Sequence, residues 1–161
     1  MIVPEIKTIP SKKLIGKCLS MSFSQNRTAE LWKSFMMERK HILNSMSTDL
    51  FSLQEYQKPY QADIFDPEMV FTKWAATEVP NFDNIPEGMA TYELKGGLYA
   101  VFLYKGHPAE GASMFQYIFT SWLPASGYEL DDRAHFEVLG DKYKNNDPDS
   151  EEEIWVPVKT K

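Results

Sequence analysis

The sequence of 161 residues has little of what several classes of function require. Cys18 is its single cysteine, so an internal disulfide is excluded, and its place in an apolar strand-like run predicts a buried, unreactive thiol. Basic residues are outnumbered, 17 against 23 acids, which gives a net charge of −6. This balance argues against direct nucleic-acid binding, which depends on clustered Lys and Arg.

Long apolar runs are also missing from the sequence. No segment approaches the roughly 20 apolar residues that a membrane span needs. Glu5 and Pro10 interrupt the first twenty residues, where a signal peptide would carry its apolar stretch. We therefore expect no membrane contact and a cytoplasmic location.

The motifs of metal and nucleophilic chemistry are absent as well. The three histidines, His41, His107 and His135, have no metal-ligand spacing. Residues 111–115 begin like a nucleophile elbow, but the closing glycine is missing and the segment lies in a predicted helix. We expect neither a metal nor a cofactor, and the sequence leaves open whether the protein is an enzyme.

The composition that remains is that of one globular domain over residues 1–161. Hydrophobic residues make up 43% and charged residues 25%, as in ordinary soluble domains. The aromatic share of 14% is high. A core accommodates aromatic side chains, and a pocket for flat ligands requires them.

An internal repeat is the most informative pattern in the chain. Moving Leu14–Gln54 forward by 84 residues superposes it on Leu98–Val138 without a gap. The identities are few, so apolar pattern rather than sequence is repeated. The match divides the chain into repeats 1–80 and 87–159, and it sets Leu53 of the first against Glu137 of the second.

Each repeat predicts the order strand, strand, helix, strand, strand. We expect an α+β fold in which two pseudo-symmetric halves form a mainly antiparallel sheet, with both helices on one face and a ligand groove on the other. The predicted strands are 2–9, 12–23, 50–56, 70–79, 88–94, 98–104, 134–139 and 153–158, and the helices begin near residues 26 and 108.

Glu137 is the leading candidate for a functional residue. Alternation in the strand 134–139 places Phe136 and Val138 on one face and His135 and Glu137 on the other. If Phe136 and Val138 pack under the helices, Glu137 and His135 face the groove. A half-buried carboxylate needs a partner or a raised pKa. The alternative is an exposed strand glutamate paired with a lysine.

Aromatic residues accompany this carboxylate. Trp155 shares the face of Glu137 if its aliphatic neighbours in the last strand face the helices. An aromatic wall beside a carboxylate suits a flat organic cation, although each aromatic side chain fits ordinary core packing equally well. The other candidates for this wall or its roof are Trp74, Phe71, Tyr56, Tyr60 and Phe65.

Several of these segments together resemble a known family. The stretch Trp122–Tyr128, then Phe136-Glu137, then Ile154–Val158 is similar to the GyrI-like domain, the effector-binding module of AraC-type and MerR-type transcription regulators. The likeness is strongest over Met89–Val158. It implies a cleft for hydrophobic, often cationic small molecules, as in multidrug sensing, with the acid of the Phe-Glu motif, Glu137, in an aromatic pocket.

The resemblance leaves three functions open. The first is a stand-alone protein that binds, senses or sequesters hydrophobic cations; without length for a helix-turn-helix, it would act on transcription through another chain. The second is a hydrolase of strained electrophilic genotoxins, with Glu137 as general acid or base. The third is a protein that inhibits a topoisomerase-like partner through the acidic segment Asp141–Glu153.

Overall fold

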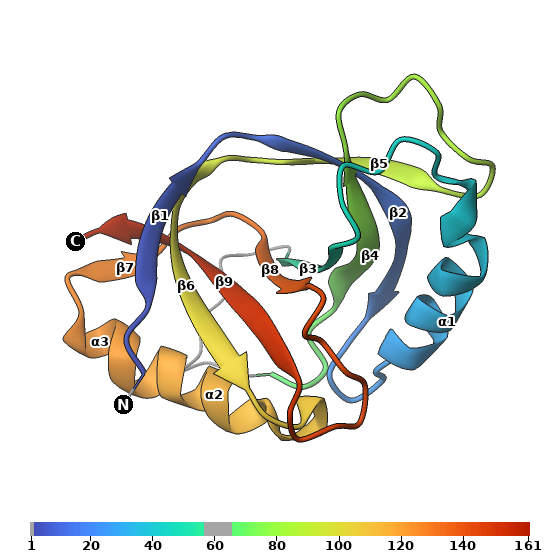
Figure 1. Cartoon of the computed structure of the whole chain (residues 1–161). Coiled ribbons are helices and arrows are strands. Elements are labelled where there is room, and N and C mark those ends of the chain that lie inside the picture. The colour runs from blue at the N-terminus through green and yellow to red at the C-terminus, as the bar shows by residue number, and fades with distance from the viewer. Residues whose placement is uncertain (1, 57–65) are drawn as a thin grey trace.

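The computed structural model describes residues 2–56 and 66–161 (Figure 1). Its elements follow the predicted order. The first half contains β1 (Glu5–Ile9), β2 (Lys12–Met21), α1 (Thr28–Glu38), β3 (Leu50–Tyr56) and β4 (Phe71–Val79). The second half contains β5 (Ala90–Leu94), β6 (Gly97–Lys105), α2 (Ala112–Tyr117), β8 (His135–Leu139) and β9 (Glu151–Thr160). The predicted α+β class is confirmed.

Two features of the second half were not expected from the sequence. A π-helical turn, Ile118–Trp122, joins α2 to the short α3 (Leu123–Ala125). After α3 comes β7 (Tyr128–Leu130), a three-residue strand that pairs with the end of β9. Three residues are too few to show an alternating pattern, so this strand has little signal in the sequence.

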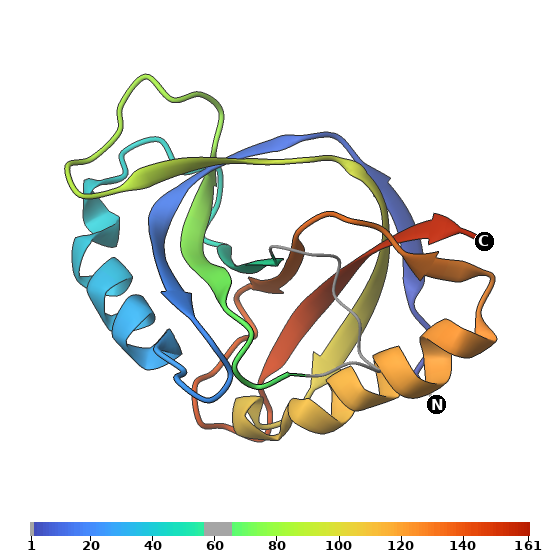
Figure 2. The same cartoon turned by 180° about the vertical axis from the view of Figure 1, so that it is seen from behind.

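All strand pairs in the described chain are antiparallel, and they form one sheet in the order β1-β6-β9-β8-β3-β4-β2-β5, with β7 beside β9. The short turns between β1 and β2 and between β5 and β6 meet, where the Gly96 amide donates to the Ser11 hydroxyl over 3.1 Å. The end strands of this order are β1 and β5, and they continue through these turns into β2 and β6. Since β1 pairs with β6 and β2 pairs with β5, the two ends of the sheet meet and the sheet curls on itself (Figures 1 and 2). The pairing of β3 with β8, called the seam below, joins the halves at the centre.

The curled sheet has two different faces. The helix face carries α1 over the first half and α2 over the second, and Figure 2 shows both helices outside the curl. Two clusters of buried apolar residues lie under α1 and α2, and the inner face holds a third cluster of its own. Its buried members are Leu14, Phe51, Leu53, Trp74, Ala76, Leu94, Tyr99, Val101, Ala134, Phe136 and Trp155.

Apolar stripes of the two helices explain why both lie on one face, as predicted. In α1, Leu31 and Phe35 are fully buried against the helix face of β2 and β4. In the second half, Met114 and Ile118 take the same role against β6 and β9. Just before α1, the side-chain oxygen of Asn26 accepts from the Thr28 amide over 2.9 Å, while the N-cap residue Arg27 makes no side-chain cap bond.

The offset of 84 between the repeats is wrong by one residue. The buried pairs Leu31 with Met114 and Phe35 with Ile118 are related by an offset of 83 instead. A slip of one residue moves every strand side chain to the opposite face. Leu53 accordingly lies on the inner face while Glu137 lies on the helix face. The offset of 83 sets Glu137 against Gln54 instead.

Cys18 also differs from its prediction, because it is exposed. It lies on the inner face of β2. The inner core covers this face as far as Gly16, so the next two residues on it, Cys18 and Ser20, are exposed. None of the helices in the described part of the chain is long and apolar enough to span a membrane.

Candidate functional site

Charged and polar side chains are buried together on the helix face at the seam. Lys73 is 9% exposed and Glu152 is 8% exposed, and Glu137 beside them is half-buried. Ser52 and His135 are buried on the same face. Burying a charged group is costly unless it is paired. This cluster is therefore the most unusual feature of the molecule.

The strand registers explain how four strands bring these residues together. Ser52 of β3 lies between Ala75 of β4 and Glu137 of β8, and Gln54 lies between Lys73 and His135. Glu137 also faces Ile154, so Glu152, two residues earlier in β9, is its diagonal neighbour. Diagonal neighbours lie roughly 7–8 Å apart at the backbone, within reach of long side chains. The small Ser52 and Ala75 leave room between Lys73 and Glu137.

Burial and mutual proximity shift the protonation of this cluster. Burial, reinforced by a hydrogen bond to Glu137 and its charge, raises the pKa of Glu152 to about 9. A hydrogen bond between two carboxyl groups requires a proton, so Glu152 donates and Glu137 accepts. Burial lowers the pKa of Lys73, and the charges of Glu137 and Glu152 oppose that shift.

Aromatic residues lie beside the cluster on the same face. Tyr56 meets His135 edge-on with ring centroids 5.4 Å apart, and Phe71 lies 5.6 Å from Tyr56. Phe119, in the helical segment of the second half, lies 6.0 Å from His135. Burial lowers the pKa of His135 to about 4, so this imidazole is neutral at physiological pH. The rings of Tyr56, Phe71 and Phe119 thus gather around His135, which is the neighbour of Glu137 on the same face of β8.

The expectation that Trp155 shares the face of Glu137 is wrong. Phe136, rather than Glu137, pairs with Trp155 and stacks on it at 5.1 Å on the inner face. Trp74 is buried on that inner face too, 5.3 Å from Tyr92. The assumption that Phe136 and Val138 pack under the helices caused the error, since both contribute to the inner core.

A cleft of about 220 Å³ lies where β3 and β8 stop pairing, at one end of the seam. This seam cleft takes Glu55 and Tyr92 from the inner face and Tyr56 and His135 from the helix face. Burial and the neighbouring Glu55 raise the pKa of Tyr92. The remaining lining residues are Lys95, Asp131, Asp132, Arg133 and Ala134.

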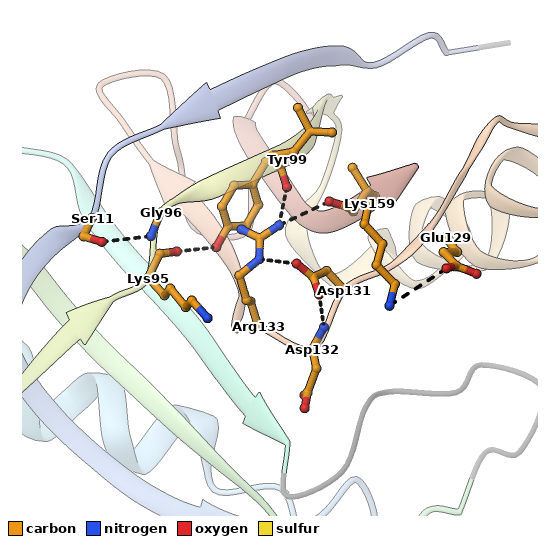
Figure 3. Close-up of polar contacts among 11 residues, drawn as sticks. Ser11, Lys95, Gly96, Tyr99, Glu129, Asp131, Asp132, Arg133 and Lys159 are labelled. Atoms are coloured by element: carbon orange, nitrogen blue, oxygen red, sulfur yellow. Dashed lines mark hydrogen bonds and ion pairs between the residues drawn. The ribbon is translucent and has the colours of Figure 1, made fainter. Parts of the chain in front are cut away.

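Arg133 lines this seam cleft, and Figure 3 shows its polar contacts. Its side chain is 5% exposed, its guanidinium lies over the Tyr99 ring at 4.6 Å, and its Nε donates to Asp131 over 2.8 Å. A terminal nitrogen donates to the carbonyls of Leu98 and Val158 over 2.6 and 3.2 Å. One side chain thereby ties β6 and β9 to the segment that enters β8.

Two of the central residues, Lys73 and Glu152, have only weak signals in the sequence. Lys73 is the one charged residue in the stretch 71–76, and such a lysine is rarely buried without a partner. Glu152 shares its parity with the buried Ile154, which places it under the helices rather than in a solvated acidic loop. Tyr60 and Phe65, the other expected aromatics, lie outside the described residues.

The donor set at the seam does not resemble a metal centre. Within residues 2–56 and 66–161, no three His, Cys, Asp or Glu side chains are grouped as metal ligands would be. Lys73 lies near enough to Glu137 and Glu152 for their charges to act on its amino group. The buried lysine Lys73, rather than a set of metal ligands, accompanies the two carboxyl groups in the described site.

Comparison with known proteins identifies the family of this fold and site. The model of the GyrI-like small molecule binding domain matches residues 3–159, so the chain belongs to this family. The transcriptional regulator BrlR of Pseudomonas aeruginosa is 25% identical over 150 residues, which are 92% of this chain and 53% of BrlR. The chain thus spans about half the length of this curated relative.

Solved structures agree with the family on the fold. SAV2435, solved bound to tetraphenylphosphonium, superposes with a TM-score of 0.72 at 16% identity, covering 97% of this chain and 93% of that one. The C-terminal domain of EcmrR superposes with a TM-score of 0.70 at 15% identity, covering 100% and 99%. The mainly antiparallel sheet with its helices is therefore the fold of this small-molecule-binding family.

Glu152 is expected to make stability depend on pH. The folded state keeps its proton up to about pH 9, whereas the unfolded chain loses it near pH 4. Because the folded state binds more protons between these values, Glu152 lowers the free energy of unfolding as pH rises, by at most about 1.4 kcal/mol per pH unit. Urea unfolding across this range should show a shallower decline for Glu152→Gln. Equal slopes for wild type and Glu152→Gln contradict the assignment, and Glu153→Gln is the matched control.

Arg133 is expected to be essential for stability. Arg133→Met leaves Asp131 and two strand carbonyls without their donor, so unfolding in urea should show a loss of about 3–5 kcal/mol. Arg27 makes an exposed ion pair with Glu30, and Arg27→Met should cost less than about 1 kcal/mol. Similar losses for the two variants would refute the tie between β6, β8 and β9.

Proposed function

We propose that the protein binds hydrophobic organic cations on the helix face at the seam. Glu137 supplies the carboxylate, and Tyr56, Phe71 and His135 supply the flat surfaces around it. The observation that carries this proposal is the buried charged cluster, whose half-buried member Glu137 lies on the same face of β8 as His135, the residue that the Tyr56 ring contacts. Carboxylates beside aromatic faces attract cations through charge and through the ring quadrupole.

The relatives support this class of ligand and a regulatory use. SAV2435 was solved with tetraphenylphosphonium, a lipophilic cation, and BrlR is a transcriptional regulator. We infer that the present chain senses or sequesters such molecules. Any effect on transcription would follow from ligand binding in this domain, because the chain's acidic balance does not favour contact with nucleic acid.

Isothermal titration with tetraphenylphosphonium tests the position of the site. Glu137→Gln should weaken binding at least tenfold, about 1.4 kcal/mol, since it removes the carboxylate that faces the ligand. Glu55→Gln removes a carboxylate of the seam cleft and should leave the affinity unchanged. The reverse ranking would move the ligand into the seam cleft, and unchanged affinity in Glu137→Gln would exclude the proposed role of that residue.

Hydrolysis is the second candidate function, and the paired carboxyl groups favour it. One carboxyl that holds a proton next to one that does not is the arrangement of general acid and base catalysis. In this reading, Glu152 protonates the leaving group of a strained electrophile while Glu137 activates water.

Turnover separates this second function from binding. Incubation with a cyclopropane-containing electrophile should yield a product enlarged by one water, and the rate should fall at least 100-fold in both Glu137→Gln and Glu152→Gln. Recovery of the unchanged compound from the wild-type protein would exclude hydrolysis of that substrate class.

A further inference from the structure

We propose that the helix-face site exchanges a proton for its cationic ligand: the pair Glu137–Glu152 holds one proton in the empty site and releases it when an organic cation binds. This inference rests on the proposed function and adds how the site balances its charge. It follows from the three charged side chains that β4, β8 and β9 place together at the seam.

The empty cluster is close to neutral. Glu137 and Glu152 are diagonal neighbours on adjacent strands, and two ionised carboxylates in a buried site repel one another. One proton shared between them leaves a single negative charge. The ammonium of Lys73, itself 9% exposed, offsets that charge. The site thus contains its own cation before any ligand arrives.

A permanent cation disturbs this balance. Its charge would be the second positive charge in a poorly hydrated site that holds one negative charge, and buried excess charge is costly. Loss of the shared proton supplies the missing negative charge at the position where the ligand needs it. Uptake of one cation should therefore release about one proton.

The other titratable groups near the pair do not supply this proton at neutral pH. Burial and the carboxyl groups raise the pKa of Tyr143, and burial raises that of Tyr104, which pairs with Glu152 across β6 and β9. These phenols stay protonated with or without a nearby cation. His135 is already neutral and has no proton to release on cation binding. Lys73 is the remaining donor, and the variants below distinguish it from the carboxyl pair.

Titration calorimetry in several buffers measures the exchange. Tetraphenylphosphonium is titrated into the wild-type protein near pH 7 in buffers that differ in ionisation enthalpy, and the dependence of heat on buffer gives the number of protons released. We expect about one proton for tetraphenylphosphonium. Triphenylphosphine oxide, a neutral molecule of similar shape, should release none if it binds.

Variants assign the proton to the carboxyl pair. Glu152→Gln leaves Glu137 with an amide donor and no shared proton, so proton release should fall to near zero. Release that persists in Glu152→Gln would assign the proton to Lys73 and overturn the proposal. Lys73→Met removes the internal cation, so it should bind tetraphenylphosphonium more tightly and release less than the wild type. The control Glu153→Gln changes the adjacent residue, whose side chain accepts from Trp155 on the inner face, and it should release the wild-type number.

A measurement on the empty protein keeps the two proposals apart. Infrared spectra near pH 7 should contain the band of a protonated carboxyl group, and Glu152→Gln should lack it. Its absence from the wild type would overturn the exchange whatever the ligand does. Binding without proton release overturns the exchange alone, whereas absence of any tetraphenylphosphonium binding overturns the proposed function together with it.

Discussion

The register of the seam is the constraint on which the rest of the structure depends. Ser52 lies opposite Glu137, and Leu53 lies opposite Phe136. That choice sends Phe136 and Leu53 into the inner core and leaves Glu137 on the face that carries the helices. A shift of one residue would place Glu137 in the apolar inner cluster and Phe136 on the helix face. The free-energy penalty of burying a lone carboxylate among apolar side chains excludes that register.

The two faces of the sheet at the seam have different roles, because one is apolar and the other is polar. On the inner face, Phe136 stacks on Trp155 and Tyr99 meets both rings edge-on, while the Arg133 guanidinium lies over the Tyr99 ring. The contact of Phe136 with Phe51 of β3, 5.8 Å between ring centroids, joins this cluster of the second half to the first half without the helices. On the helix face, the two helices cover their own halves and the polar cluster lies at the seam. The rigid inner core therefore positions groups that would repel one another if they were left to adjust.

Electrostatics couples the ionisable groups of the helix face to one another. In a site with little water, two carboxyl groups and an ammonium group interact strongly, so a change in one alters the protonation of the others. The arrival of the proposed cationic ligand would be one such change. A domain that senses ligands benefits from this coupling, because occupancy then alters charge and hydrogen bonding at the junction of its two halves.

The sequence by itself determined the element order, the α+β class, the placement of both helices on one face and the candidacy of Glu137. These follow from local periodicity and from turn residues, which act over a few positions of the chain. The strand limits of β3 were predicted for that reason. Only the tertiary structure decided the face of Glu137, the separation of Trp155 and Trp74 from it, and the presence of Lys73 and Glu152 at its side. Strand parity divides the side chains of a strand between two faces without saying which face the helices cover. The register between strands far apart in sequence makes that choice, because it depends on side chains from several segments being buried together.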